Sequence, residues 1–469
     1  MPRRPHHHPV SLALALVAIA LLNGCSLIPA YERPALPVSR QFPGAAEEPA
    51  EQPAAADTHW REFIAAPRLV RLVEAALDNN RDLRVAALRV EQSRAEYRRS
   101  RSALFPSLDL RVAYTRQGTG DVPAGVDATT SSASLSAAST AYELDFFGRV
   151  RSGNEQALQQ YLQTEEAKRS AQISLVAEVA TQYFALREAE EQLTLARQTL
   201  ELVQESYRLN TVSFDAGQID ALDLRTSEGQ MQSAKISVVT YERERAQAEN
   251  QLVLLIGAPL PADLPAAEPF GANVLADIPA GLPAELAERR PDILAAEHAL
   301  LAANANIGVA RAAFFPQISL TGSAGRTSDA LGTLLGAGTG IWSFAPQLTL
   351  PLFKGGSNRA NLDAAQAAKQ IEVASYERTI QTAFREVADA LVAADTYALE
   401  TQAQQAAIDA QTQRFTLADA RYRQGEVAYL TVLQAQQDLY SAQQGRLRAE
   451  RSRASSQIAL YRALGGGWQ

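Results

Sequence analysis

Residues 104–113 read LFPSLDLRVA, and residues 314–321, starting 210 positions later (104 against 314), read FFPQISLT. In the first stretch Leu108, Leu110 and Val112 alternate with polar or small residues. A two-residue alternation is typical of a β-strand with one apolar face. The sequence therefore predicts a strand in each stretch, and their likeness predicts an internal duplication.

Other short motifs recur at nearly the same spacing. Residues 214–217 (FDAG) recur as residues 422–425 (YRQG), and residues 178–180 (EVA) recur identically as residues 386–388. A shared offset over several motifs indicates two copies of one structural unit. We therefore expect both halves of the chain to have the same order of elements.

Each repeat is expected to begin with a medium helix and two strands, followed by a very long helix and a returning helix. The medium helices cover residues 82–103 and 291–313, the strand pairs 105–116 with 133–147 and 315–325 with 341–353, the long helices 149–216 and 357–424, and the returning helices 220–255 and 427–464. The long helices contain no proline, and at about 1.5 Å per residue each reaches about 100 Å.

Apolar residues in the long helices recur every three or four positions, as in a coiled coil. One such seam holds Ile380, Phe384, Val387, Leu391, Ala394 and Ala398, and its counterpart holds Val176, Val179, Tyr183 and Leu186. The helices alone would suit a soluble coiled-coil rod, but a rod leaves the alternating strands unexplained.

The N-terminus has the pattern of a bacterial lipoprotein signal. Arg3 and Arg4 precede the apolar residues 11–22, and Leu-Asn-Gly-Cys follows, ending at Cys25. This run is too short to span a bilayer and suits a signal peptide. The Leu-x-Gly-Cys pattern resembles the lipobox, although Asn23 stands where a smaller residue is usual. We expect residues 1–24 to be cleaved and Cys25 to carry diacylglycerol and an N-acyl chain. The alternative is an ordinary signal peptide with an incidental cysteine.

Composition excludes several other functions. The net charge is −8, and no basic run is interleaved with aromatic residues, so nucleic-acid binding has no support. Cys25 is the only cysteine, which rules out an intrachain disulfide, and the histidines lack the spacing of a zinc site. No nucleophile motif or phosphate-binding loop is present, so we expect neither an enzyme nor a metal. After the signal, no stretch is expected to be apolar enough for a transmembrane helix.

The predicted architecture points to transport. Four strands cannot close a barrel, and an open sheet edge facing lipid leaves costly unpaired backbone groups. The smallest bacterial barrels have about eight strands, so copies of the chain must complete the wall. The sequence does not fix the number of copies. The long helices would continue such a barrel as a tube, and a barrel joined to a tube is a duct.

Several motifs carry a resemblance to a known family. They are residues 59–63 (HWREF) followed by Pro67, residues 142–149 (YELDFFGR), residues 288–293 (ERRPDI) and residues 352–356 (LFKGG). Over nearly the whole mature chain, the sequence resembles the TolC-type outer-membrane factors, in the lipoprotein branch typified by OprM and NodT.

The resemblance implies an α+β membrane protein, a homotrimer whose twelve-stranded β-barrel takes four strands from each chain and continues as a periplasmic helical barrel. It also implies contact with outer-membrane lipid, a periplasmic membrane-fusion adaptor and an inner-membrane pump of the RND class, with efflux of drugs or toxic compounds. The domains expected are a lipid-anchored tether (25–57), a first repeat (58–257), an equatorial linker (258–290) and a second repeat (291–469).

The candidate site lies where the two helical hairpins turn. Gly217 and Gly425 stand where a helix must end, as in a left-handed C-cap. Asp220, followed by Asp223, has the pattern of a helix N-cap with an acidic first turn. A structural role for Asp220 is therefore the simplest interpretation.

In the family these tips close the tube through polar links between hairpins. By position, Asp223 and Tyr422 match residues of such links, and Arg421, Glu426 and Asp220 are further gate candidates. The chain departs from its relatives at positions where they carry ring-forming aspartates, which hold Val427, Thr431 and Gln434.

Alternative functions stay open at this point. A structural coiled-coil lipoprotein that spaces two membranes would need no strands, so the duplication of the strands favours the duct. Within the duct class, protein secretion and metal export remain alternatives to small-molecule efflux. Because no catalytic constellation is present, the energy for transport must come from a partner.

Overall fold

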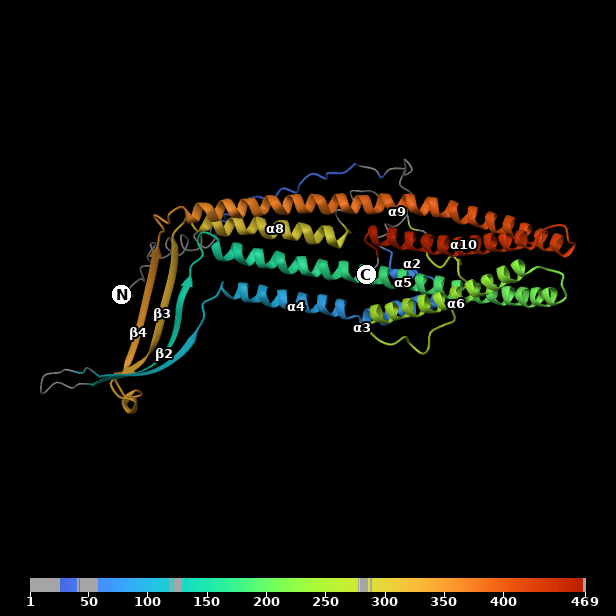
Figure 1. Cartoon of the computed structure of the whole chain (residues 1–469). Coiled ribbons are helices and arrows are strands. Elements are labelled where there is room, and N and C mark those ends of the chain that lie inside the picture. Colours follow the sequence, from blue (N-terminus) through green and yellow to red (C-terminus); the bar gives the residue numbers. More distant parts are fainter. Residues whose placement is uncertain are drawn as a thin grey trace, which may run out of the picture. The chain divides into compact units, whose positions relative to one another are not determined.

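The computed structural model describes residues 26–39, 42, 58–118, 120, 129–276, 278, 286 and 289–466. The predicted signal peptide (1–24), Cys25 and most of the predicted tether lie outside the described residues. Figure 1 shows the described elements in sequence colours.

The described chain contains helices and one sheet, in an order that repeats. The elements are α2 (Trp60–Phe63), α3 (Pro67–Asn79), α4 (Arg81–Ser102), β1 (Asp109–Gly118), β2 (Thr129–Glu143), α5 (Arg149–Asp215), α6 (Ala221–Ile256), α8 (Pro291–Ala312), β3 (Gln317–Ser328), the 3₁₀ helix η2 (Leu331–Thr333), β4 (Gly340–Thr349), α9 (Ser357–Arg423) and α10 (Tyr429–Ala463). From α4 to α6 and from α8 to α10, the plan is a helix, two strands, a long helix and a returning helix.

The long helices agree closely with the sequence prediction. Helices α5 and α9 have 67 residues each, which corresponds to about 100 Å. Each ends just before a glycine with positive φ, Gly217 or Gly425. Helix boundaries were predictable because glycine and proline interrupt a sequence that is otherwise rich in good helix formers.

The strand boundaries required correction. β1 begins at Asp109 and not at residue 105, and β2 covers Thr129–Glu143 where residues 133–147 were expected. The Ser/Thr tract from residue 129 has no apolar alternation, yet it forms a ladder because Thr129 and Thr130 pair with Gly118 and Gln117 of β1. A partner strand therefore set this boundary, and no local pattern revealed it.

Two short helices, α2 and α3, were not predicted. α3 begins with Pro67 at its first position, where the missing N–H is not needed for helix bonding. One side of this helix is fully buried, and it consists of Leu69, Leu72, Val73 and Ala76. The three- and four-residue spacing of these side chains was the available signal.

Helix α8 contradicts the expectation that no later segment is apolar enough to cross a membrane. By length and composition alone, Pro291–Ala312 could span one. Several of its side chains, including Ile293, Leu300 and Ile307, are instead buried against the chain itself. The buried Asn304 donates a hydrogen bond of 2.8 Å to the carbonyl of Pro29. We therefore interpret α8 as a packed helix whose apolar character serves the core.

The four strands form one antiparallel sheet in the order β1-β2-β3-β4. A register shift between Ser139 and Tyr142 marks a bulge in β2, where Ala141 has a φ of 53°. β1 and β4 are the edges, and every residue in both is exposed. Helix α4 likewise has no buried residue. One chain therefore leaves both edge strands exposed and buries no side chain of α4 fully.

The described chain divides into two compact units, and each takes segments from both repeats. One contains the sheet with residues 89–165 and 295–376, and the other contains residues 36–88, 166–294 and 377–469. The core of the second unit includes the predicted seam residues Val176, Val179, Tyr183 and Leu186. In the other seam Ile380 and Val387 are buried, whereas Ala398 is exposed.

A buried arginine connects three helices of this second unit. Arg290 is 7% exposed, and its Nη1 donates a hydrogen bond of 2.6 Å to the carbonyl of Ala463 at the end of α10. Its Nε and Nη2 donate to Asp292 and Glu386, both at 2.9 Å. Burial opposes the charge, but these carboxylates raise the pKa of Arg290 overall. The arginine satisfies a carbonyl that the helix end would otherwise leave unpaired.

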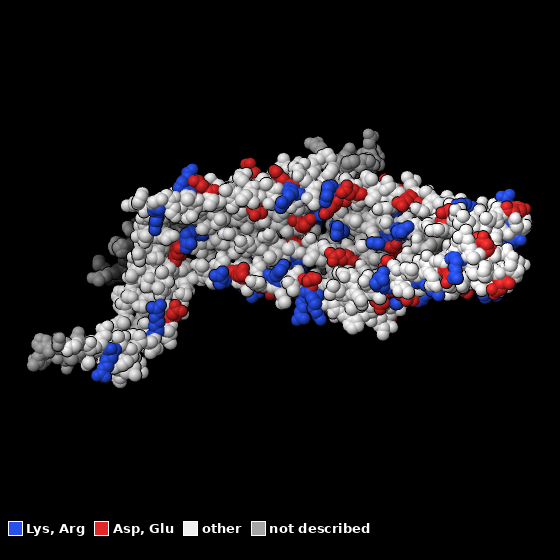
Figure 2. Space-filling model, in the orientation of Figure 1, with Lys and Arg blue, Asp and Glu red and all other residues white. Residues whose placement is uncertain are grey.

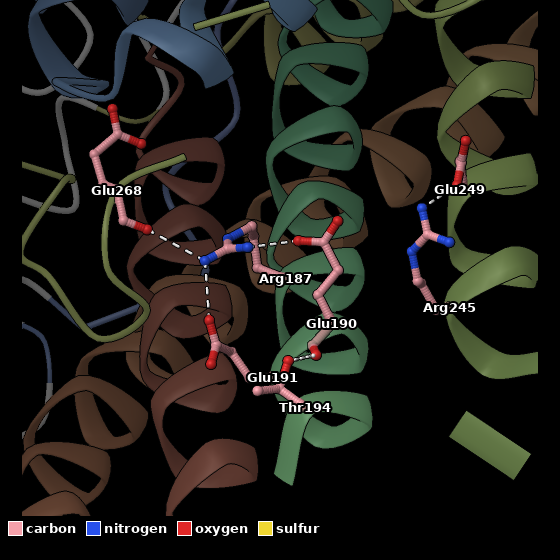
Figure 3. Close-up of polar contacts among 7 residues, drawn as sticks. All are labelled: Arg187, Glu190, Glu191, Thr194, Arg245, Glu249 and Glu268. Carbon is pink, nitrogen blue, oxygen red and sulfur yellow. Dashed lines mark hydrogen bonds and ion pairs between the residues drawn. The ribbon is translucent and has the colours of Figure 1, made fainter. Parts of the chain in front are cut away.

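The linker after α6 is attached to the middle of α5 by Arg187. Figure 3 shows this side chain between Glu190, Glu191 and the backbone of Glu268. Its Nη2 lies 3.1 Å from Glu191 Oε1 and 3.3 Å from the carbonyl oxygen of Glu268. Only 12% of the side chain is exposed, so solvent screens these contacts little.

In the unit that contains the sheet, the segment from Leu27 to Arg33 lies along α8. Arg311 donates to the carbonyl of Leu27 at 3.2 Å. At the other end, Tyr31 Oη and Arg33 Nε donate to Glu297 Oε1 at 3.0 and 2.9 Å. Burial and the hydrogen bond to Glu297 raise the pKa of Tyr31. Residues 27–33, which follow Cys25 closely, are therefore attached to α8 by hydrogen bonds.

Candidate functional site

The first hairpin turns through a tight glycine cap. After α5 ends at Asp215, Gly217 adopts a φ of +68°. Its N–H donates to the carbonyl of Phe214 at 2.9 Å, and the N–H of Gln218 donates to Ser213 at 2.8 Å. This pair of bonds is a Schellman motif, in which a left-handed residue allows the last helical carbonyls to be satisfied.

The second hairpin repeats this geometry 208 positions later (217 against 425). Gly425 has a φ of +78°, and its N–H donates to the carbonyl of Tyr422 at 2.9 Å. The N–H of Glu426 donates to Arg421 at 3.0 Å. A side chain at either glycine would strain the backbone, because L-residues rarely adopt positive φ. The structure thus places both predicted glycines at equivalent turns.

Asp220 caps the helix that follows the first turn. Its Oδ1 accepts a hydrogen bond of 2.9 Å from the backbone N–H of Asp223. The equivalent position in the second hairpin is Ala428, which makes no side-chain cap. The structural role suggested for Asp220 by the sequence therefore accounts for its position fully.

Arg421 and Glu426 pair with each other across the second turn. Arg421 Nε lies 3.2 Å from Glu426 Oε2, and the side chains are 64% and 50% exposed. Exposed pairs of this kind contribute less than about 1 kcal/mol, so the turn depends mainly on its backbone bonds. Both charges lie at the turn of the second hairpin.

Asp223 and Tyr422 come from different hairpins and lie close enough for the charge of one to act on the other. Burial, and secondarily the charge of Asp223, raise the pKa of Tyr422. The ring of Tyr422 lies 5.3 Å from that of Tyr429 at the start of α10. The charge of Asp223 thus acts on Tyr422 of the other hairpin, and their assignment to one link stays a prediction.

Tyr429 is a residue that the sequence analysis missed. It is 7% exposed and packs with Ala418, Val432 and Leu433. Burial raises its pKa, and hydrogen bonds with Asn210 and Ser206 of α5 partly offset this rise. Tyr429 thus connects the second hairpin to the long helix of the first. The sequence signal for Tyr429 is an aromatic residue soon after a glycine turn. Its partner Asn210 on α5 is over 200 positions away in the sequence (429 against 210), so the contact could not be read from neighbouring residues.

Three positions stand where relatives are expected to carry aspartates. Thr431 and Gln434 are exposed, and Val427 is half-buried. In the described part of the chain, no group of three or more His, Cys, Asp or Glu residues could hold a metal ion. Cys25 lies outside the described residues.

The sequence profile of the outer membrane efflux protein family matches residues 72–258 and 282–466. The chain belongs to this family. The two matched ranges lie close to the two repeats predicted from the sequence, residues 58–257 and 291–469.

Curated relatives align over nearly their whole length. The chain is 47% identical to a solvent efflux pump outer membrane protein, SrpC, of Pseudomonas putida, over 97% of this chain and 98% of the relative. It is 46% identical to the outer membrane protein OprJ of Pseudomonas aeruginosa, over 97% and 95% of the respective chains.

Solved structures give the same result. The open state of the Neisseria gonorrhoeae outer-membrane channel MtrE matches with a TM-score of 0.86 and 39% identity, over 95% of this chain and 99% of that one. A membrane protein from Pseudomonas aeruginosa matches with a TM-score of 0.87 and 43% identity, over 94% and 100%.

These likenesses confirm the predicted family and fold class. The efflux protein is an outer-membrane channel with helical hairpins in the periplasm, and it is a transport duct, not an enzyme. The coiled-coil spacer considered from the sequence is thereby excluded.

Proposed function

We propose that three copies of this efflux protein form a passive exit duct for toxic small molecules. Each is anchored by lipid on Cys25, and the duct receives its cargo from an RND-class inner-membrane pump through a periplasmic adaptor. The single observation that supports the assembly is the pair of uncovered sheet edges. β1 and β4 have ten residues each, all of them exposed. Strands of about 9–11 residues suit the hydrocarbon thickness of a bilayer.

Closure by other copies follows from the cost of leaving these edges open. Each unsatisfied N–H or C=O in hydrocarbon costs several kcal/mol, and only a closed barrel removes both edges. When β1 of one copy pairs with β4 of the next, three copies with four strands each give twelve strands. The same assembly would cover α4, which has no buried residue within one chain.

Two observations support the lipid anchor. They are the sequence around Cys25 and the hydrogen bonds that attach the following residues to α8. Two or three acyl chains give stable anchoring, because each buried CH₂ contributes about 0.8 kcal/mol. The contacts of Leu27, Tyr31 and Arg33 with α8 would hold this anchor beside the end of the helix that precedes β3.

The names of the relatives support the cargo and the partners. Relatives that are 46–47% identical are named as outer membrane proteins of solvent, toluene and antibiotic efflux pumps. A pump component needs further components, because no energy-coupling motif is visible in this chain. Small apolar or amphiphilic toxins are therefore favoured over secreted proteins or metal ions as cargo.

The hairpin tips are the proposed gate. Asp223, Tyr422 and Tyr429 would hold the two hairpins of one chain together when the periplasmic end is closed. Movement of one hairpin against the other would have to break the contacts of Tyr429 with Asn210 and Ser206. The tips are also the surface offered to the adaptor.

Deletion of the gene tests the cargo class. We expect the deletion strain to become more susceptible to organic solvents and lipophilic antibiotics, and a plasmid copy to restore resistance. A Cys25→Ser copy tests the lipid anchor. It should restore resistance only weakly, because the protein then lacks its acyl chains. Unchanged susceptibility, accompanied by loss of a secreted protein or by sensitivity to metal ions alone, would contradict the proposal.

A further inference from the structure

The strand register sorts the side chains of the sheet onto two faces of opposite character. On one face Leu110 lies level with Ala137, which in turn pairs with Ala324 and then Trp342. The next row runs from Arg111 through Ser136 and Gly325 to Ile341 and belongs to the other face. The two rows alternate along the ladder, so the register assigns each paired residue to one of the two faces.

The first face is suited to lipid. Its exposed side chains include Val112, Tyr114, Trp342, Phe344 and Leu348, which are 54–81% exposed in one chain. Such a band of aliphatic and aromatic side chains is the outer surface of a membrane barrel. The opposite face must then line the pore.

The pore face is lined mainly by hydroxyl and amide groups. It carries Thr115, Ser132, Ser134, Ser323, Ser343 and Gln347. The hydroxyls of Ser323 and Ser343 are hydrogen-bonded to each other at 2.7 Å. A Cβ added at Gly325 would lie only 2.6 Å from Ser136 Cα, so the strands approach closely on this face. A glycine in a strand often marks such a bend in a barrel wall.

Charge is scarce on this face. Within the four described strands its charged side chains are Asp109, Arg111 and Glu143. Glu143 is already paired with Arg149, whose Nε donates to it at 2.9 Å. Arg116 and Arg326 fall on the lipid-side face, and Arg326 donates to the carbonyl of Leu335 in the adjoining loop at 2.7 Å. On the side of the sheet that Figure 2 shows, the surface is mostly uncharged, whereas both signs are mixed over the helices.

Asp109 and Arg111 are therefore the charges that oppose each other along the pore. They are exposed and two positions apart on one strand, a separation of about 6.6 Å along the strand. In a closed barrel each would be repeated once per chain, giving an acidic ring beside a basic ring. Rings of one sign select ions in other channels, and adjacent rings of opposite sign offset each other.

We infer that Asp109 and Arg111 keep the barrel section of the pore electrically balanced, so that it passes neutral, cationic and anionic solutes alike. This inference rests on the proposed trimeric duct. It assigns to two residues of β1 a role in specificity that differs from that of the hairpin tips. The barrel then selects solutes by size. Its ability to pass both cations and anions depends on the acidic ring of Asp109 and the basic ring of Arg111 being present together.

Ion permeability of the purified protein in planar bilayers tests the balance. In a KCl gradient, Arg111→Gln should shift the reversal potential toward that of K⁺, and Asp109→Asn should shift it toward that of Cl⁻. Arg116→Gln is the matched control, because it removes the same charge from the same strand on the lipid side, and it should cause no shift. The shifts should occur with native tips and with tips opened by Asp223→Asn and Tyr422→Phe.

Cysteine labelling tests the assignment of the faces without relying on current. Arg111→Cys in the membrane-inserted protein should react with a water-soluble maleimide, and Val112→Cys should not. The parent protein, with Cys25 alone, gives the background. The inference is wrong if the parent conducts and both charge variants have the same reversal potential as the parent. It is also wrong if the cysteine at residue 112 reacts and the cysteine at residue 111 does not. A parent that never conducts would instead contradict the proposed duct.

Discussion

The rings of Tyr422 and Tyr429 lie 5.3 Å apart, so that the last turn of α9 and the first turn of α10 meet across the glycine turn. Tyr422 also lies near Asp223 of the first hairpin, whose charge contributes to raising its pKa. Tyr429 reaches Asn210 and Ser206 on α5. Side chains of the first hairpin therefore influence both tyrosines of the second hairpin.

Weakening this contact should favour the open tip. We expect the double variant Asp223→Asn, Tyr422→Phe to show a higher conductance in planar bilayers than the wild type, because both the charge and the phenol of the link are lost. Asp215→Asn is the control, since it removes an exposed acid from the same tip without touching Tyr422. Equal currents in the double variant and the wild type would remove Asp223 and Tyr422 from the gate.

Loss of the buried arginine should destabilise the protein strongly. Arg290→Met leaves Asp292, Glu386 and the carbonyl of Ala463 without their partner, and breaking a buried ion pair typically costs about 3–5 kcal/mol. We expect a clearly lower midpoint of thermal unfolding by circular dichroism. Arg359→Met, which removes an exposed pair with Asp363, should cost less than about 1 kcal/mol. Similar midpoints for the two variants would contradict the role given to Arg290.

The packing of residues 27–33 against α8 should depend on Gly308. A Cβ there would lie 2.7 Å from Ile28 Cγ1 and 2.6 Å from Ser152 Oγ. We expect Gly308→Ala to lift the segment, so that amides of residues 27–33 exchange hydrogen faster by mass spectrometry. Gly153→Ala, at a site with no neighbour within 4 Å, should leave their exchange unchanged. Unaltered exchange in Gly308→Ala would show that the segment is held elsewhere.

His298 should make stability fall in mild acid. Burial lowers its pKa, although Glu297 and Glu165 oppose the shift. The unfolded chain therefore binds the proton more readily than the folded one. The stabilisation is complete above the unfolded pKa of about 6.5 and is lost as the pH falls below it.

The variant His298→Gln keeps a group able to hydrogen-bond Gln159 but cannot titrate. Its thermal midpoint should therefore change less between pH 7.5 and pH 5.5 than that of the wild type. If both proteins lost the same amount, protonation of His298 would not be the cause.

Much of the fold could be predicted because its signals are local. The long helices follow from uninterrupted helix formers, and the turns follow from Gly217 and Gly425. The start of β2 could not be found in this way, since Thr129 belongs to the sheet only through its pairing with Gly118. The apolar character of α8 is visible in its composition and was underestimated, whereas its burial depends on contacts between distant segments, such as that of Asn304 with Pro29.

The candidate site was predictable only in part. The cap formed by Asp220 is a contact between neighbours in sequence, and its pattern was visible. Tyr429 was missed because its role depends on which face of α10 meets α5. Alternation along β1 already separates Arg111 from Val112, but only the register shows that Ser136 shares a face with Arg111 and Leu135 with Val112. Contacts between distant segments therefore set the limit of the sequence analysis.

The mass of the complex extracted from the outer membrane tests the central claim most directly. Because both sheet edges are uncovered in one chain, native mass spectrometry in detergent should show three lipidated chains, and the same preparation should conduct in bilayers. A species with the mass of one chain that leaves liposomes impermeable would contradict the account.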